Sequence, residues 1–148
     1  MIDFKSIKLT NGLTVISDFN PDTPMATLSI AYKAGSKHED SEKTGLAHLF
    51  EHLMFGGSKN VPHYDQQVEL AGGNNNAFTT ADYTNYYITL PALNIETAFY
   101  LESDRMFYPN LSPDVLEIQR KVVLEEYNQR VLNPPYGDVM TNLLPMVY

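Results

Sequence analysis

The chain has 148 residues, of which 43% are hydrophobic and 19% are charged. This length fits one domain or part of a larger one, and the balance is typical of folded proteins rather than disordered ones. Acidic residues outnumber basic ones by 18 to 10, so the net charge of −8 argues against nucleic acid or an anionic membrane as the main partner.

Three further absences narrow the class of protein. The sequence contains no cysteine, which excludes disulfide bonds, thiolate metal ligands and cysteine nucleophiles. No run approaches the roughly 18 apolar residues of a transmembrane helix. The first residues, MIDFKSIKL, lack the apolar core of a signal peptide. We therefore expect a soluble protein whose compartment is unknown, since the cytoplasm and the periplasm both fit.

The first third of the chain predicts strands followed by a helix. Residues 4–16 form a predicted hairpin, because Asn11-Gly12 stands between two alternating runs and both residues tolerate positive φ. Alternating apolar residues predict a strand at 26–34. The polar residues 35–43 indicate a loop, and residues 44–55 predict a helix that ends before a Gly-Gly pair.

The rest of the chain is mainly helical. A short helix is predicted at 64–71, and residues 74–90, rich in Thr, Tyr and Phe, predict two strands or one strand with an irregular lead. Further helices are predicted at 94–108 and from 113 to about 131, the last with Ser, Pro and Asp at its start. Strands first and helices later predict an α+β fold, with an antiparallel or mixed sheet packed against helices.

The most informative string is HLFEH, residues 48–52, inside the predicted helix. Helical geometry places His48, Glu51 and His52 on one arc of about 100°. Two imidazoles one turn apart can bind one Zn²⁺, and a neighbouring carboxylate can take a proton from water and pass it to a leaving amine. We predict His48 and His52 as ligands and Glu51 as general base; the alternative is a solvated polar face. The opposite face, expected to anchor the helix, is apolar: Leu46, Leu49, Phe50, Leu53 and Met54.

A tetrahedral zinc site needs a further protein ligand. The other two histidines, His38 in a polar loop and His63 beside a proline, are expected at the surface. Acidic candidates lie in the last predicted helix: Glu117, Glu125 and Glu126.

Helix phase separates these acidic candidates only in part. Glu126 continues an apolar stripe at positions 115, 118 and 122, where a carboxylate is costly unless something such as zinc pairs with it. Phase therefore favours Glu126 and leaves Glu125 open. The alternative is an ordinary surface Glu126 paired with Arg130 at i+4.

The order H-x-x-E-H is the inverted zinc signature. This signature and three stretches of sequence resemble the N-terminal part of an M16-family (pitrilysin/insulinase-like) metallopeptidase. The resemblance implies a LuxS/MPP-like metallohydrolase half-domain. The stretches are HLFEHLMFGGS from His48 to Ser58, GGNNNAFTTADYTNYY from Gly72 to Tyr87, and QRKVVLEEYNQR from Gln119 to Arg130.

The resemblance implies a zinc-dependent endopeptidase that hydrolyses peptides or small unfolded proteins, with one Zn²⁺ per site. It places the distal ligand at Glu126, beside His48 and His52, and gives Glu51 the activation of water. It also implies that Asn76, Ala77 and Phe78 form an edge strand that pairs with the substrate backbone. Gln119 stands where many members carry a Glu that would support the ligands. Tyr86 and Tyr87 are expected in the core rather than at the substrate.

Active members that the chain resembles have two homologous halves, and the second supplies an Arg and a Tyr that hold the substrate. Because no second half fits in 148 residues, and because the ending NLLPMVY is apolar, we expect 1–148 to be the truncated N-terminal part of a catalytic half-domain. Alone it should be inactive. The C-terminal half would come in the same chain or from a partner subunit, and a homodimer is a further arrangement. The alternative functions are a non-catalytic partner or structural subunit, and a domain that zinc merely stabilises.

Overall fold

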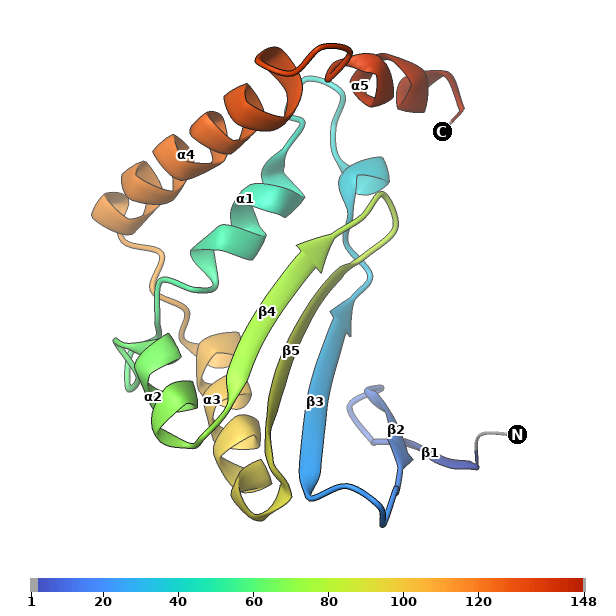
Figure 1. The fold of residues 1–148 in the computed structure, drawn as a ribbon, viewed down its shortest axis with the longest axis vertical. Helices are drawn as coiled ribbons and strands as arrows, with labels where there is room; N and C mark the ends of the chain where they lie inside the picture. Colours follow the sequence, from blue (N-terminus) through green and yellow to red (C-terminus); the bar gives the residue numbers. More distant parts are fainter. Residues whose placement is uncertain (1–2, 148) are drawn as a thin grey trace.

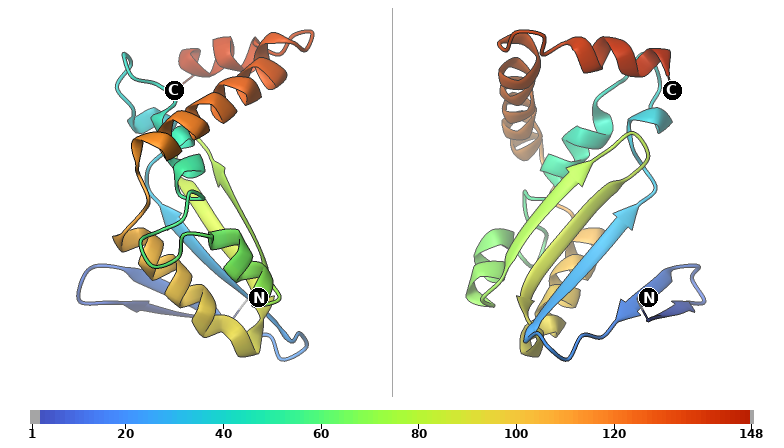
Figure 2. Two further views of the ribbon diagram at one scale, coloured as in Figure 1. Left: turned by 90° about the vertical axis from the view of Figure 1, so that its left-hand side faces the viewer. Right: turned by 45° about the vertical axis from the view of Figure 1, so that its right-hand side comes forward.

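The computed structural model describes residues 3–147 and has the predicted α+β class (Figure 1). Strands β1 (Phe4–Lys8) and β2 (Thr14–Asp18) form an antiparallel hairpin. Its turn has Gly12 at φ 90°, a conformation that suits glycine, so the predicted hairpin is confirmed. All residues of both strands are exposed, and the hairpin stands apart from the larger sheet (Figure 2).

The larger sheet has the order β3–β5–β4 and is antiparallel throughout. Strand β3 is Met25–Tyr32, β4 is Asn74–Thr79 and β5 is Thr84–Pro91, so residues 74–90 do form two strands. In β5 the alternate residues Thr84, Tyr86, Ile88 and Leu90 are all buried, which marks the face that the helices cover. Strand β4 is an edge of this sheet.

Three helices pack on that face (Figures 1 and 2). They are α1 (Leu46–Leu53), α2 (Tyr64–Leu70) and α3 (Ile95–Phe107), close to the predicted bounds. The main core lies between β5, α2 and α3, while α1 lies along the upper half of the sheet. The core residues are Val61, Tyr64, Val68, Ile88, Leu90, Ala98 and Leu101.

Helix α4 (Pro113–Tyr127) forms a further layer because it packs on α1 and not on the sheet (Figure 1). It continues as a π-helical turn, Asn128–Leu132, which agrees with the predicted end near residue 131. A short helix, α5 (Val139–Leu143), was not predicted from the sequence. Within residues 3–147, none of the helices combines the length and apolarity needed to cross a membrane.

A buried charge ties α3 to the end of α1. Arg105 forms an ion pair of 2.6 Å with Glu102, and both side chains are nearly inaccessible. The guanidinium stacks between the rings of Tyr64 and Tyr86, at 4.4 and 4.5 Å from their centroids, and contacts the carbonyl of Met54. Burial raises the pKa of both tyrosines, so Tyr64 remains a donor to Glu102. The predicted core position is confirmed for Tyr86, whereas Tyr87 is only half-buried, on the opposite face of β5.

The expected anchoring of α1 is only partly correct. Leu53 and Met54 are buried and Leu49 is half-buried, whereas Leu46 and Phe50 are 49% and 50% exposed. Leu46 and Phe50 line a cavity of about 550 Å³ instead of contacting a closed core. The physical reason is that α3 meets α1 at its C-terminal end, where Arg105 reaches the carbonyl of Met54.

Candidate metal centre

The N-terminus of α1 is held by a residue from the preceding loop. Gly45 is the N-cap at φ 88°, and glycine has no side chain that could accept the free N–H groups of the first turn. The carboxylate of Glu39 accepts hydrogen bonds from the N–H groups of Gly45 and Ala47, both at 2.6 Å. Glu39 was not predicted from the sequence, because it lies six residues before the N-cap, outside the positions that capping rules describe.

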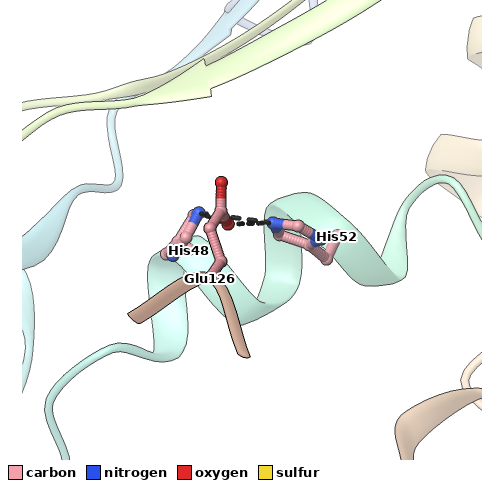
Figure 3. A group of neighbouring side chains, drawn as sticks. All are labelled: His48, His52 and Glu126. Carbon is pink, nitrogen blue, oxygen red and sulfur yellow. Dashed lines mark hydrogen bonds and ion pairs between the residues drawn. The ribbon is translucent and has the colours of Figure 1, made fainter. Parts of the chain in front are cut away.

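Helix α1 presents its two histidines on the side that faces α4. Their Nε2 atoms lie 3.3 Å apart, and both side chains are half-buried. Glu126 enters from α4, with its Oε2 atom 3.4 Å from Nε2 of His48 and 3.3 Å from Nε2 of His52 (Figure 3). The structure thus brings together the three residues predicted as metal ligands.

This triangle has the dimensions of a tetrahedral zinc site. Ligand atoms about 2.05 Å from zinc, at tetrahedral angles, lie about 3.3 Å from one another. The three measured separations are 3.3, 3.3 and 3.4 Å. In addition, Glu126 Oε2 is buried without a hydrogen-bond partner among the described residues, a costly state for a carboxylate oxygen that a cation would relieve. The donor set therefore fits zinc and leaves a fourth position for another ligand.

The second carboxylate oxygen of Glu126 has its own partner. Arg130, in the π-helical turn, lies 2.6 Å from Oε1, so the pair considered as an alternative to metal binding is present but uses the other oxygen. Glu125 instead accepts a hydrogen bond from Gln129 on the exposed surface. Glu117 pairs with Arg120, which holds the pKa of that carboxyl below its usual range. His38 and His63 are exposed, as predicted.

The predicted apolar stripe of α4 was wrong in its middle. Positions 118 and 122 are 58% and 45% exposed, and the half-buried row facing α1 passes through 115, 119 and 123 before Glu126. Both rows connect position 115 to position 126 in three helical turns, so both lead to the same glutamate. Gln119 lies in this row, on one face of α4 with Glu126, and the predicted supporting role of its side chain stays a prediction.

The side chain of Glu51 contacts the sheet. Its Oε2 atom accepts a hydrogen bond of 2.5 Å from Oγ1 of Thr79, the last residue of β4. The general-base candidate is therefore attached to the edge strand, while Glu126 approaches from the other helix. Thr79 was not predicted from the sequence, because the contact joins residues from separate elements.

The predicted substrate-binding residues lie in the middle of β4. Ala77 is half-buried on the face of the sheet that carries Thr79, and Asn76 and Phe78 are exposed on the other face. Within the described residues, β4 pairs with β5 alone, opposite Tyr87, Tyr86 and Asn85, so its outer edge is unpaired. An unpaired edge beside the candidate base can accept an extended peptide as an added strand.

The chain is similar to several known proteins. The chain is 36% identical over 136 residues to the zinc protease PqqE of Helicobacter pylori, covering 90% of this chain and 31% of that protein. It is 33% identical over 124 residues to the mitochondrial-processing peptidase subunit beta of Saccharomyces cerevisiae, covering 82% of this chain and 27% of the relative. It is 32% identical over 139 residues to subunit 1 of the bovine mitochondrial cytochrome b-c1 complex, covering 93% of this chain and 28% of that subunit.

A solved structure shows the same fold. The crystal structure of a protease from Helicobacter pylori matches with a TM-score of 0.89 and 34% identity, over 95% of this chain and 34% of that one. The chain thus spans 27% to 34% of the length of these relatives. The family described as insulinase (peptidase family M16) matches residues 14–146. This chain therefore belongs to the insulinase family, peptidase family M16.

Proposed function

We propose that this chain carries the zinc site of an endopeptidase that hydrolyses peptides or small unfolded proteins. One observation carries the proposal: two imidazole nitrogens and a buried, unsatisfied carboxylate oxygen form a triangle with tetrahedral zinc spacing. A general-base candidate stands on the same helix as the histidines. Family membership and the zinc protease among the relatives support this assignment.

His48, His52 and Glu126 would hold the metal. Zinc, when bound, would lower the pKa of a water molecule towards 7 and polarise the scissile carbonyl. Glu51 would take the proton from the attacking water on one carboxylate oxygen and deliver it to the departing amine. The outer edge of β4, at Asn76 to Phe78, would hold the substrate backbone in extended form next to this base.

In this proposal, the complete catalytic assembly includes more protein than this chain. Because the chain spans about a third of its relatives, we propose that a C-terminal half, in the same polypeptide or in a partner subunit, completes the substrate cleft. Two relatives are named as subunits, of a processing peptidase and of the cytochrome b-c1 complex, which favours the partner arrangement as one option.

The names of those subunits also support a second candidate, a non-catalytic partner or structural subunit. The chemistry of this chain weighs against it. A structural role needs neither the three converging ligand atoms nor a carboxylate on the same helix that is bound to the edge strand, and both are present. A zinc site that only stabilised the fold would be closed by four protein ligands, whereas residues 3–147 bring three together.

The deciding experiment replaces Glu51 by Gln in the full-length protein that contains this chain. Peptide hydrolysis should fall by about 10²- to 10⁴-fold, the usual contribution of a general acid–base group. Zinc content should stay at one per chain, since Glu51 is not a ligand. Glu42→Gln, an exposed change in the same region, serves as the matched control. Unchanged hydrolysis in Glu51→Gln, or purified protein without zinc, would overturn the proposal.

A further inference from the structure

The geometry points to Thr79 as a positioning residue for Glu51, an inference that rests on the proposed peptidase function. Its Oγ1 atom lies 2.5 Å from Oε2 of Glu51, across the contact between α1 and the edge strand β4. Within residues 3–147, the hydroxyl bonds to Glu51 and Thr84 and to none of the three candidate ligands. It would therefore act on the reaction only through the carboxylate that it holds.

Hydrogen-bond arithmetic fixes the direction of this contact. The hydroxyl of Thr84 donates to the carbonyl of Ala34 at 2.9 Å, which uses its single proton. Thr79 lies directly opposite Thr84 in the sheet, with 3.2 Å between the two hydroxyl oxygens. As a general base Glu51 offers only acceptor oxygens, so Thr79 donates its own proton to Glu51, at 2.5 Å, rather than to the more distant Thr84. Because a hydroxyl also accepts, Thr79 can still serve Glu51 after the carboxylate has taken a proton.

The surroundings make this an ordered contact. Thr84 is 4% exposed, and Thr79 and Glu51 are both half-buried, so water competes weakly for the hydroxyl. A hydrogen bond to one carboxylate oxygen fixes the rotation of the group and leaves Oε1 for the reacting water. Thr79 also follows Phe78 directly in β4, so the strand proposed to pair with substrate also sets the position of the base.

The test compares Thr79→Val, which keeps the shape but removes the hydroxyl, with Thr79→Ser, which keeps the hydroxyl, in the full-length protein. Val should lower kcat by about 10- to 100-fold, the range for a lost hydrogen bond to a charged group, with KM and zinc content unchanged. Ser should restore kcat to within about threefold of the parent. Thr89→Val is the matched control, because it removes a hydroxyl pair with Thr27 from the same sheet, away from Glu51.

A double-variant cycle separates positioning from a general structural effect. If Thr79 acts through Glu51, adding Thr79→Val to Glu51→Gln should lower kcat by less than about threefold. A crystal structure of zinc-loaded Thr79→Val gives a readout other than activity, and it should show the Glu51 carboxylate displaced or disordered. If the Thr79→Val protein fails to fold, Thr79→Cys supplies a weaker donor of similar size. Its kcat should lie between that of Thr79→Ser and the value expected for Thr79→Val.

The outcomes distinguish this inference from the proposed function. If Glu51→Gln abolishes hydrolysis but Thr79→Val retains the parental kcat, the positioning role is wrong and the peptidase proposal stands. A full multiplicative loss in the double variant, or loss of zinc in Thr79→Val, would also overturn the role. If Glu51→Gln hydrolyses normally, the proposed function fails and the inference fails with it.

Discussion

Oε2 of Glu126 lies 3.3 Å from Nε2 of His52, although the two residues belong to different helices. Neither this contact nor the one to Nε2 of His48 is a hydrogen bond, and the oxygen has no hydrogen-bond partner within residues 3–147. A buried acceptor facing two ring nitrogens is costly in the absence of a cation. The packing of α4 on α1 thus brings three potential metal ligands together in a contact that a bound cation would relieve.

Replacement of Glu126 by Gln should therefore remove zinc from the protein. The amide keeps the shape but supplies a neutral, weaker donor, so we expect bound zinc well below one per chain after dialysis, measured by atomic absorption or mass spectrometry. Glu125→Gln is the matched control, because that carboxylate faces Gln129 on the surface and should leave zinc content unchanged. Loss of zinc from Glu125→Gln and its retention in Glu126→Gln would contradict the ligand assignment.

Local patterns predicted the parts of the site that one helix supplies. The arc of His48, Glu51 and His52 follows from helical geometry alone, because residues at i and i+4 share a face. Helical phase favoured Glu126 through the wrong row of α4. The apolar residues at 118 and 122 suggested one row and the structure uses another, but both rows end at Glu126.

The contacts that hold the site in place were not predictable by the same means. Glu39 reaches α1 from a loop, and Thr79 reaches it from the sheet. Both contacts depend on how separate segments of the chain pack together. Rules on hydrophobic periodicity and helix capping do not describe such packing. The strands and helices themselves follow their alternation and end signals, and α5 was missed because its five residues are too few to show a period.

Glu39→Gln should destabilise the protein through the N-terminus of α1. The carboxylate accepts two backbone hydrogen bonds and places negative charge at the positive end of the helix. We expect a loss of about 1 kcal/mol in the free energy of unfolding, the usual value of an N-cap, measured by urea denaturation followed by circular dichroism. Glu42→Gln changes the same charge in the same region and should match the parent. Equal stability of the two variants would show that Glu39 does not cap α1.

The Glu39→Gln change should also weaken the metal site, because His48 lies in the turn that Glu39 caps. Fraying of this turn lowers the fraction of chains with both imidazoles in place, so zinc affinity should fall, by at most about fivefold for a cap that contributes about 1 kcal/mol. Competition with a chromogenic chelator measures this change. Lower stability with unchanged zinc affinity would mean that the cap supports the fold but not the site.

The hydrogen bonds of Asp104 predict how the stability of the folded protein depends on pH. Its carboxylate accepts hydrogen bonds from the hydroxyl of Ser58 and from the side-chain and backbone nitrogens of Asn60, in the segment between α1 and α2. The bond from Ser58, followed by those from Asn60, holds the pKa of Asp104 below its ordinary value. In the unfolded chain an Asp has a pKa of about 3.9.

Because the folded pKa is the lower one, the ionised Asp104 stabilises the native state fully above the unfolded pKa, and this contribution is lost as pH falls through the folded pKa. Asp104→Asn should therefore be less stable than the parent at pH 7, and the difference should shrink as the pH drops below about 4. Urea denaturation across this range measures the effect, with the exposed Asp22→Asn as control. If the difference in stability between the parent and Asp104→Asn stayed constant with pH, the hydrogen bonds would not favour the ionised carboxyl.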